Sequence, residues 1–132
     1  MIIHVKNKST LIIDDFIIKC CIGKKGLNLN KKEGDYSTPK GLFNLKKLYY
    51  RKDRVNPPKC DIRKKIIKKN TAWCDDPTHK KYNEEIKSYN KKNKENFYRI
   101  DHKYDYLITI SHNNQKIPNK GSAIFIHVAR NN

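Results

Sequence analysis

The sequence lacks a C-x-x-C pair, because its four cysteines lie at positions 20, 21, 60 and 74. Structural zinc sites are usually built from such closely spaced pairs, so we predict no metal site. Cys20 and Cys21 are adjacent in an apolar run, where successive strand side chains point to opposite faces. At least one of them is therefore expected to fill the core. The spacing gives no reason to expect disulfides.

The chain also lacks a long apolar run. Its longest ones are far shorter than a bilayer span, so we predict no transmembrane segment. The first residues, MIIHVKNKST, contain a lysine at position 6 and no unbroken apolar stretch of the kind found in secretory signals. We therefore expect that any export signal is missing or unconventional.

Arginine is scarce as well: only 5 of the 30 basic residues are arginines, although the formal net charge is +17. A basic surface gains affinity for polyanions by releasing counterions. Recognition of base edges and bidentate phosphate contacts favour arginine, however. Lysine, asparagine and isoleucine, all abundant here, share adenine- and thymine-rich codons, so genome composition explains much of the basicity. What remains fits an anionic partner such as cell-wall polymer, a membrane surface or nucleic acid, and nucleic acid is not favoured.

What the sequence does contain is a series of short β-branched runs between polar turns, which is typical of strands. With 132 residues it has the length of one domain. A strongly charged segment from Arg51 to Lys94 is predicted to be a long excursion, with one short helix near 80–91. Order returns with the strand-like runs YLITIS and SAIFIHVA. We predict a mainly β fold with a sheet or sandwich core.

Two histidines end the last two predicted strands. Period-two alternation places Ile126 and Val128 on one face, which we expect to be the core, and Phe125 and His127 on the other. In the preceding strand His112 shares a face with Ile110. We therefore predict that His112 and His127 meet at a sheet rim that opens into a cleft, although a hydrogen-bonded structural role is the alternative for each. A histidine there suits general-base work, because its pKa lies near neutrality.

No nucleophile in the chain has a convincing position relative to these histidines. The candidates are Ser111 and the four cysteines. Cys74 lies in WCDDP, where two carboxylates would raise the thiol pKa and suppress the thiolate. Asp75 and Asp76 are typical of a turn, with a general-acid pair or a metal site as alternatives.

Five segments in order resemble the motifs of YkuD-type L,D-transpeptidase catalytic domains. The most specific is KKEGDYSTPKGLFNL (31–45), which is similar to K-x-E-G-D-x-x-T-P-x-G-x-F. The others are KCCIGKKG (19–26), AWCDDP followed by YN (72–77 and 82–83), YRIDHKYDYLITISHNN (98–114) and GSAIFIHVAR (121–130). Each motif alone would be weak, but five in the same order make a specific resemblance.

This resemblance implies an L,D-transpeptidase-like β-sandwich of mixed sheets, with 1–132 forming a single catalytic domain that is incomplete at its C-terminus. His127 matches the catalytic histidine. The family's nucleophilic cysteine lies in an [S/T]-x-G-C segment one short loop later, and we expect it beyond Asn132. His112 is expected to line the substrate cleft, together with Ser111, which stands where the family's turn often has glycine.

The implied activity is cysteine acyl transfer on peptidoglycan stem peptides, without metal or organic cofactor, which forms cross-links or trims the stems. The implied location is the cell envelope or periplasm, and anionic wall polymer is a second expected partner. Two alternatives remain open. One is a catalytically dead domain of the same fold that binds peptidoglycan or anionic polymer, and the other is a basic nucleic-acid-binding domain.

Overall fold

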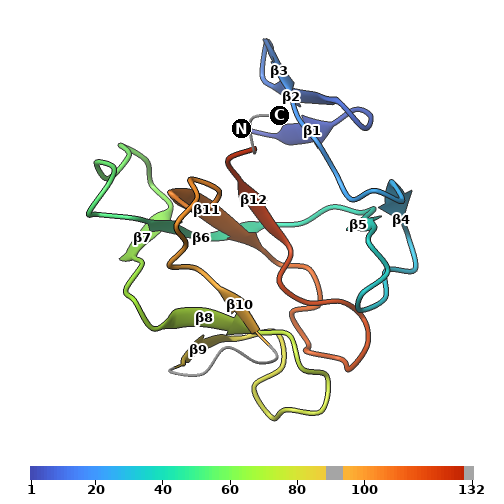
Figure 1. The fold of residues 1–132 in the computed structure, drawn as a ribbon. Helices are drawn as coiled ribbons and strands as arrows, with labels where there is room; N and C mark the ends of the chain where they lie inside the picture. Colours follow the sequence, from blue (N-terminus) through green and yellow to red (C-terminus); the bar gives the residue numbers. More distant parts are fainter. Residues whose placement is uncertain (89–93, 130–132) are drawn as a thin grey trace. The chain divides into compact units, whose positions relative to one another are not determined.

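The computed structural model describes residues 1–88 and 94–129, which form short strands and no helix (Figure 1). The chain divides into two compact units, Met1–Gly41 and Leu42–Asn132. The strands are β1 (Ile3–Val5), β2 (Thr10–Ile13), β3 (Phe16–Lys19), β4 (Leu27–Asn28), β5 (Thr38–Pro39), β6 (Leu45–Tyr50), β7 (Arg63–Ile66), β8 (Thr71–Cys74), β9 (Glu85–Lys87), β10 (Lys94–Asn96), β11 (Tyr106–Ile110) and β12 (Phe125–His127).

The first unit contains an antiparallel sheet in the order β1-β2-β3 and a parallel pair, β4 and β5. All four residues of β3 are exposed, and the cysteines that follow it are not in a core: Cys20 is half-buried and Cys21 is exposed. The expectation that one of them fills the core is therefore wrong. The apolar strand before these cysteines, β3, forms hydrogen bonds with β2, but no other part of this unit covers its side chains. All four cysteines of the chain are free thiols.

The signature loop at 31–45 is held by an ion pair between a buried lysine and a partly buried aspartate. Lys31, only 7% exposed, places its Nζ 2.5 Å from Asp35 Oδ1. Burial alone would raise the pKa of Asp35, but hydrogen bonds from Lys31, the Lys32 backbone and Ser37 outweigh it and hold that pKa far below its usual range. Gly23 lies against this loop, since a Cβ there would come within 2.4 Å of the Tyr36 carbonyl oxygen. These residues of the motif thus stabilise one conformation of the loop.

The second unit is built from two sheets. One is four-stranded and mixed, in the order β12-β11-β6-β7, with β6 and β7 parallel. The other is three-stranded and antiparallel, in the order β10-β8-β9. The predicted mainly β fold is confirmed. Strands β7, β8 and β9 come from the charged 51–94 segment, so much of that segment belongs to the sheets.

The short helix predicted near 80–91 is not present as far as residue 88. The chain turns at Asn83, whose φ of 56° is left-handed, and then forms β9. Ile86 of β9 pairs with Ala72 of β8. A single short helix is marginal on its own, so pairing along β8 is the better way to satisfy this backbone. Residues 89–91 of the predicted helix lie outside the described part.

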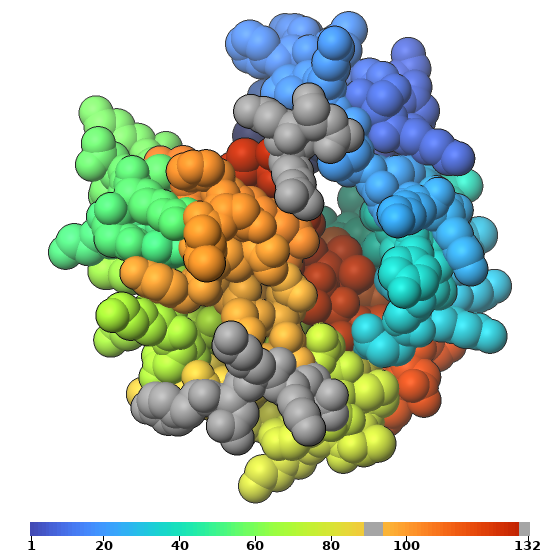
Figure 2. All heavy atoms as spheres, in the orientation of Figure 1, coloured from blue at the N-terminus to red at the C-terminus, as the bar shows by residue number. Residues whose placement is uncertain are grey.

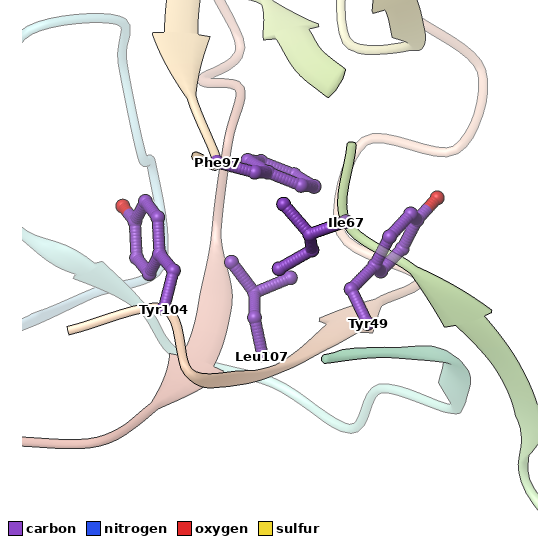
Figure 3. Close-up of a cluster of buried hydrophobic side chains, with 5 residues drawn as sticks. All are labelled: Tyr49, Ile67, Phe97, Tyr104 and Leu107. Carbon is purple, nitrogen blue, oxygen red and sulfur yellow. The ribbon is translucent and has the colours of Figure 1, made fainter. Parts of the chain in front are cut away.

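An aromatic cluster fills the space between the two sheets (Figure 3). Phe97 is at its centre and has no exposed surface. Its ring centroid lies 5.2 Å from that of Tyr49, 5.2 Å from that of Phe125 and 6.2 Å from that of Trp73. These partners come from β6, β12 and β8, so Phe97 contacts both sheets and joins them.

A tyrosine–glutamate hydrogen bond closes each side of this core. On the β7–β9 side, the Tyr49 hydroxyl donates to Glu85 Oε2 at 2.7 Å. On the β10–β12 side, the Tyr104 hydroxyl donates to Glu95 Oε1 at 2.7 Å. Burial, together with the neighbouring carboxylate, raises the pKa of both phenols well above the usual range, so both tyrosines stay neutral donors. The sandwich therefore has two separate polar edges.

Residues 51–54 are anchored by arginines. Figure 2 shows this green part of the chain lying directly against the orange residues around 98–105. Arg51 is only 3% exposed; it donates to the carbonyl of Arg99 at 2.7 Å and lies 3.6 Å from the centroid of the Tyr98 ring. Arg54 pairs with Asp105 at 3.1 Å. These contacts hold the segment that leads into β11.

Candidate active site

His127 is the last residue of β12 and lies on the inner face of the four-stranded sheet. It pairs with Leu107 of β11, which pairs in turn with Tyr49 of β6. Directly opposite residues project to the same face, so His127 shares the face of Leu107 and Tyr49, both of which are core residues. Because β12 is an edge strand, the imidazole lies at the border of the core.

This placement corrects the predicted faces of the last strand. Phe125, on the same face as His127, packs against the aromatic cluster, whereas Val128 is 41% exposed. The expectation that Ile126 and Val128 face the core is therefore wrong. Both faces of this strand are apolar, and the aromatic partners contributed by β8 and the residue after β10 decide which one is buried.

The predicted meeting of two histidines at one rim is also wrong. Strands β11 and β12 are antiparallel, so His127 lies beside Leu107, near the start of β11, whereas His112 follows the end of β11. Five residues along a strand separate the two positions by on the order of 15 Å. Neighbouring antiparallel strands end at opposite rims, which the sequence pattern alone did not reveal.

His112 and Ser111 make well-defined contacts of their own. The His112 Nε2–H donates to the Lys120 carbonyl at 2.9 Å, and the ring packs edge-on against Phe43 at 5.6 Å. The Ser111 hydroxyl accepts from the Asn44 backbone N–H at 2.9 Å, and the Ser111 N–H donates to the Asn44 carbonyl at 3.0 Å. These contacts link the turn after β11 to the segment before β6. A substrate-binding role for both residues stays a prediction.

Asn83 is an organising residue that residue-by-residue reasoning missed. Its Oδ1 accepts from Trp73 Nε1 at 2.8 Å and from the Ala123 N–H at 3.2 Å. Its Nδ2 donates to the carbonyls of His112 at 3.2 Å and Asn113 at 3.0 Å. One side chain therefore ties β8, the turn after β11 and the entry to β12. The only signal in the sequence was the Y-N pair of the resemblance.

The His127 ring is held in one orientation by two neighbours. Its Nδ1–H donates to the Val128 carbonyl at 2.9 Å, since a carbonyl can only accept. Its ring forms a T-shaped contact with that of Tyr104, with the ring centroids 5.3 Å apart and the planes at 76°. With the proton on Nδ1, Nε2 is the nitrogen that can accept another.

The surroundings of His127 favour the neutral imidazole. Although part of the residue is exposed at the edge of the sheet, the neighbouring core displaces water from much of the ring. This burial lowers the pKa of His127 below its ordinary value, and the charges of Lys103 and Arg99 act in the same direction. The Val128 carbonyl and Glu95 oppose the shift without reversing it. Together these surroundings favour the form of His127 in which one ring nitrogen carries no proton.

The thiols of Cys74 and Cys20 are poorly suited to act as nucleophiles. Cys74 is 2% exposed, and burial raises its pKa, with further increases from Asp75, Asp76 and Glu84. Burial, together with Cys21, also raises the pKa of Cys20. In both cases less of the reactive thiolate is present at neutral pH.

Asp76 forms a turn, as its sequence predicted. Its Oδ1 accepts from the Thr78 N–H at 2.9 Å and from the Thr78 hydroxyl at 2.7 Å. Among residues 1–88 and 94–129, no cluster of three or more histidine, cysteine or acidic side chains could hold a metal ion. The Asp75–Asp76 pair is thus part of the WCDDP turn that follows β8.

The sequence of residues 2–132 matches the family model of the L,D-transpeptidase catalytic domain, YkuD. The chain belongs to the L,D-transpeptidase catalytic domain family. The match spans both compact units and includes all five motifs. No curated protein and no solved structure matches the chain significantly. In the part of the L,D-transpeptidase domain that the structure describes, no helix combines the length and apolarity needed to cross a membrane.

Proposed function

We propose that this L,D-transpeptidase domain catalyses cysteine acyl transfer on peptidoglycan stem peptides, with His127 as the general base. The observation that carries the proposal is the fixed His127 imidazole, with Nδ1–H bonded to the Val128 carbonyl and a lowered pKa. A neutral ring in this tautomer directs Nε2 to the proton that it would remove. The proposal assigns the nucleophilic thiol to a cysteine of the [S/T]-x-G-C type, as in the family pattern.

The reaction follows from this arrangement. His127 Nε2 takes the thiol proton, and the thiolate attacks the carbonyl carbon after the third residue of the stem. Backbone N–H groups near the nucleophile stabilise the oxyanion. The C–N bond then breaks, the imidazolium returns its proton to the leaving D-alanine amine, and a thioester remains. An amine of a neighbouring stem forms a cross-link from this thioester, or water releases the trimmed stem; either way the thiol is restored.

Tyr104 is proposed to position His127 during this reaction. The tyrosine is 4% exposed, and its hydroxyl is fixed by Glu95, which also lies 3.6 Å from Arg99. The Arg99 guanidinium lies 5.5 Å from the centroid of the Tyr104 ring. The Tyr104 ring, fixed by these contacts, limits rotation of the His127 imidazole. The partners implied are stem peptides of the cell envelope or periplasm, and the proposed chemistry requires no cofactor.

The proposal is tested with the full-length protein incubated with a muropeptide that carries a tetrapeptide stem. Intact-mass spectrometry is expected to show the tripeptide thioester adduct, and chromatography is expected to show released D-alanine. Muropeptide binding without an adduct and without D-alanine would instead establish a non-catalytic binding domain of the same fold, and the proposal would be wrong.

A further inference from the structure

A groove of about 1090 Å³ lies in the second unit, away from His127. Its walls come from strands β6 and β7 of one sheet and from β8, β9 and the first residue of β10 of the other, with the end of β11 between them. Neither His127 nor Tyr104 lines it. His112, for which a substrate-binding role is predicted, and Lys94 of β10 do line it, so the groove extends from β7 and β9 toward the turn after β11. Its volume is at the upper end for small-ligand pockets, which suits a chain better than a single ion.

Lysine is concentrated in this groove beyond its general abundance. Seven of the 21 lining residues are lysines, one in three, against 25 of 132, about one in five, in the whole sequence. No arginine among the described residues lines it. The groove therefore has more positive charge than composition alone explains, and it presents that charge as compact ammonium groups.

The groove's glutamates are already neutralised from within. Glu85 Oε1 lies 2.7 Å from Lys65 Nζ, and its other oxygen accepts from Tyr49. Burial alone would raise the pKa of Glu85, but these hydrogen bonds outweigh it and lower the pKa, with help from the charge of Lys47. Glu84 is paired with Lys116. The third carboxylate of the described lining, Asp76, accepts hydrogen bonds from Thr78, and lysines outnumber carboxylates there by seven to three.

Three of the remaining lysines, Lys46, Lys81 and Lys87, are exposed. Within residues 1–88 and 94–129, no carboxylate forms an ion pair with any of the three. They belong to β6, the turn before β9, and β9. Positive charges on both walls of one groove can contact successive anionic groups of an extended chain.

The tyrosine and the tryptophan of the groove are engaged in the core. Tyr49 is 1% exposed and bonded to Glu85. Trp73 packs on Phe97 and Phe125 and donates its N–H to Asn83. Proteins that bind single-stranded nucleic acid combine positive charge with open aromatic faces, and the described lining lacks the second element. Its chemistry favours an anionic backbone without bases.

We propose that this groove binds a phosphodiester-linked polyol polymer of the cell envelope, through Lys46, Lys81 and Lys87. The choice of an envelope polymer rests on the proposed function, which places the domain beside peptidoglycan. Because neither His127 nor Tyr104 lines the groove, a polymer bound at these three lysines leaves the His127 imidazole open to stem peptides. The groove would thus hold the enzyme at the wall while the separate site reacts.

The test is fluorescence anisotropy with a labelled synthetic oligo(glycerol phosphate) of about eight phosphates. If each of the three lysines contacts one phosphate and the slope is that of a flexible single strand, affinity is expected to fall about 20-fold between 50 and 200 mM salt. The triple variant Lys46→Gln, Lys81→Gln and Lys87→Gln is expected to change the slope of log affinity against log salt from about −2.1 to near zero. The control variant Lys52→Gln, Lys59→Gln and Lys69→Gln removes the same charge from exposed positions outside the groove.

The control variant is expected to keep the wild-type salt slope. Equal losses in the two triple variants would show that net charge alone drives binding and would overturn the assignment to the groove. A single-stranded DNA of equal charge that binds as tightly, with the same dependence on the groove lysines, would overturn the envelope polymer as ligand. Release of D-alanine from a soluble muropeptide does not depend on polymer binding. A failure of the polymer proposal can therefore be distinguished from a failure of the proposed function.

Discussion

Replacing His127 with glutamine is expected to lower the rate of D-alanine release by about 10²- to 10⁴-fold, the usual contribution of general-base catalysis. The glutamine amide can still form hydrogen bonds, but it cannot take a proton from the thiol. The effect should fall on kcat rather than on KM, because the proposed role lies in the chemical step. Initial rates with a tetrapeptide muropeptide measure both parameters.

His4→Gln is the matched control for this change. His4 lies in β1, is exposed, and belongs to the other compact unit, so the same substitution there is expected to leave kcat near the wild-type value. A His127→Gln enzyme whose kcat stays within about threefold of wild type would contradict the role of His127 as the base.

Replacing Phe97 with alanine is expected to reduce the free energy of unfolding by about 3–5 kcal/mol, the range for truncating a large buried aromatic residue. Phe97 is completely buried and contacts rings on β6, β8 and β12, so its removal opens a cavity between the two sheets. Because Phe125 packs on Phe97 and lies two residues before His127, the same cavity would loosen the strand that carries the base. Urea unfolding followed by tryptophan fluorescence measures the change through Trp73, which stacks on Phe97.

Phe16→Ala removes the same side-chain atoms at a residue that is 70% exposed. It is expected to change the free energy of unfolding by less than about 0.5 kcal/mol, as is usual at the surface. A Phe97→Ala loss no larger than that of Phe16→Ala would show that the aromatic cluster does not join the sheets.

Local sequence patterns could predict which segments form strands, but they could not predict how those strands pair with one another. The runs YLITIS and SAIFIHVA contain β11 and β12, because β-branched residues between turn signals are a local property. The direction in which two strands pair is not local. For this reason His112 and His127 were expected at one rim and lie at opposite ends of the β11–β12 pair.

The buried face of β12 was missed for a related physical reason. Alternation correctly placed Phe125 and His127 on one face and Ile126 and Val128 on the other. Each face contains a large apolar residue, so the pattern did not show which face is buried. The partners that bury Phe125 are Phe97 and Trp73, which come from distant parts of the chain. The role of Asn83 is equally non-local, since its four hydrogen bonds reach β8, the turn after β11 and the entry to β12.

The protonation state of His127 tests the central claim most directly. Long-range ¹H–¹⁵N NMR of the imidazole, recorded across a pH titration, reports both the tautomer and the pKa of this ring. The account predicts a proton on Nδ1, a free Nε2 at neutral pH, and a pKa below the ordinary value of 6.5. A ring protonated on Nε2 at neutral pH, or a pKa above 6.5, would contradict the assignment of His127 as a base poised to accept a proton.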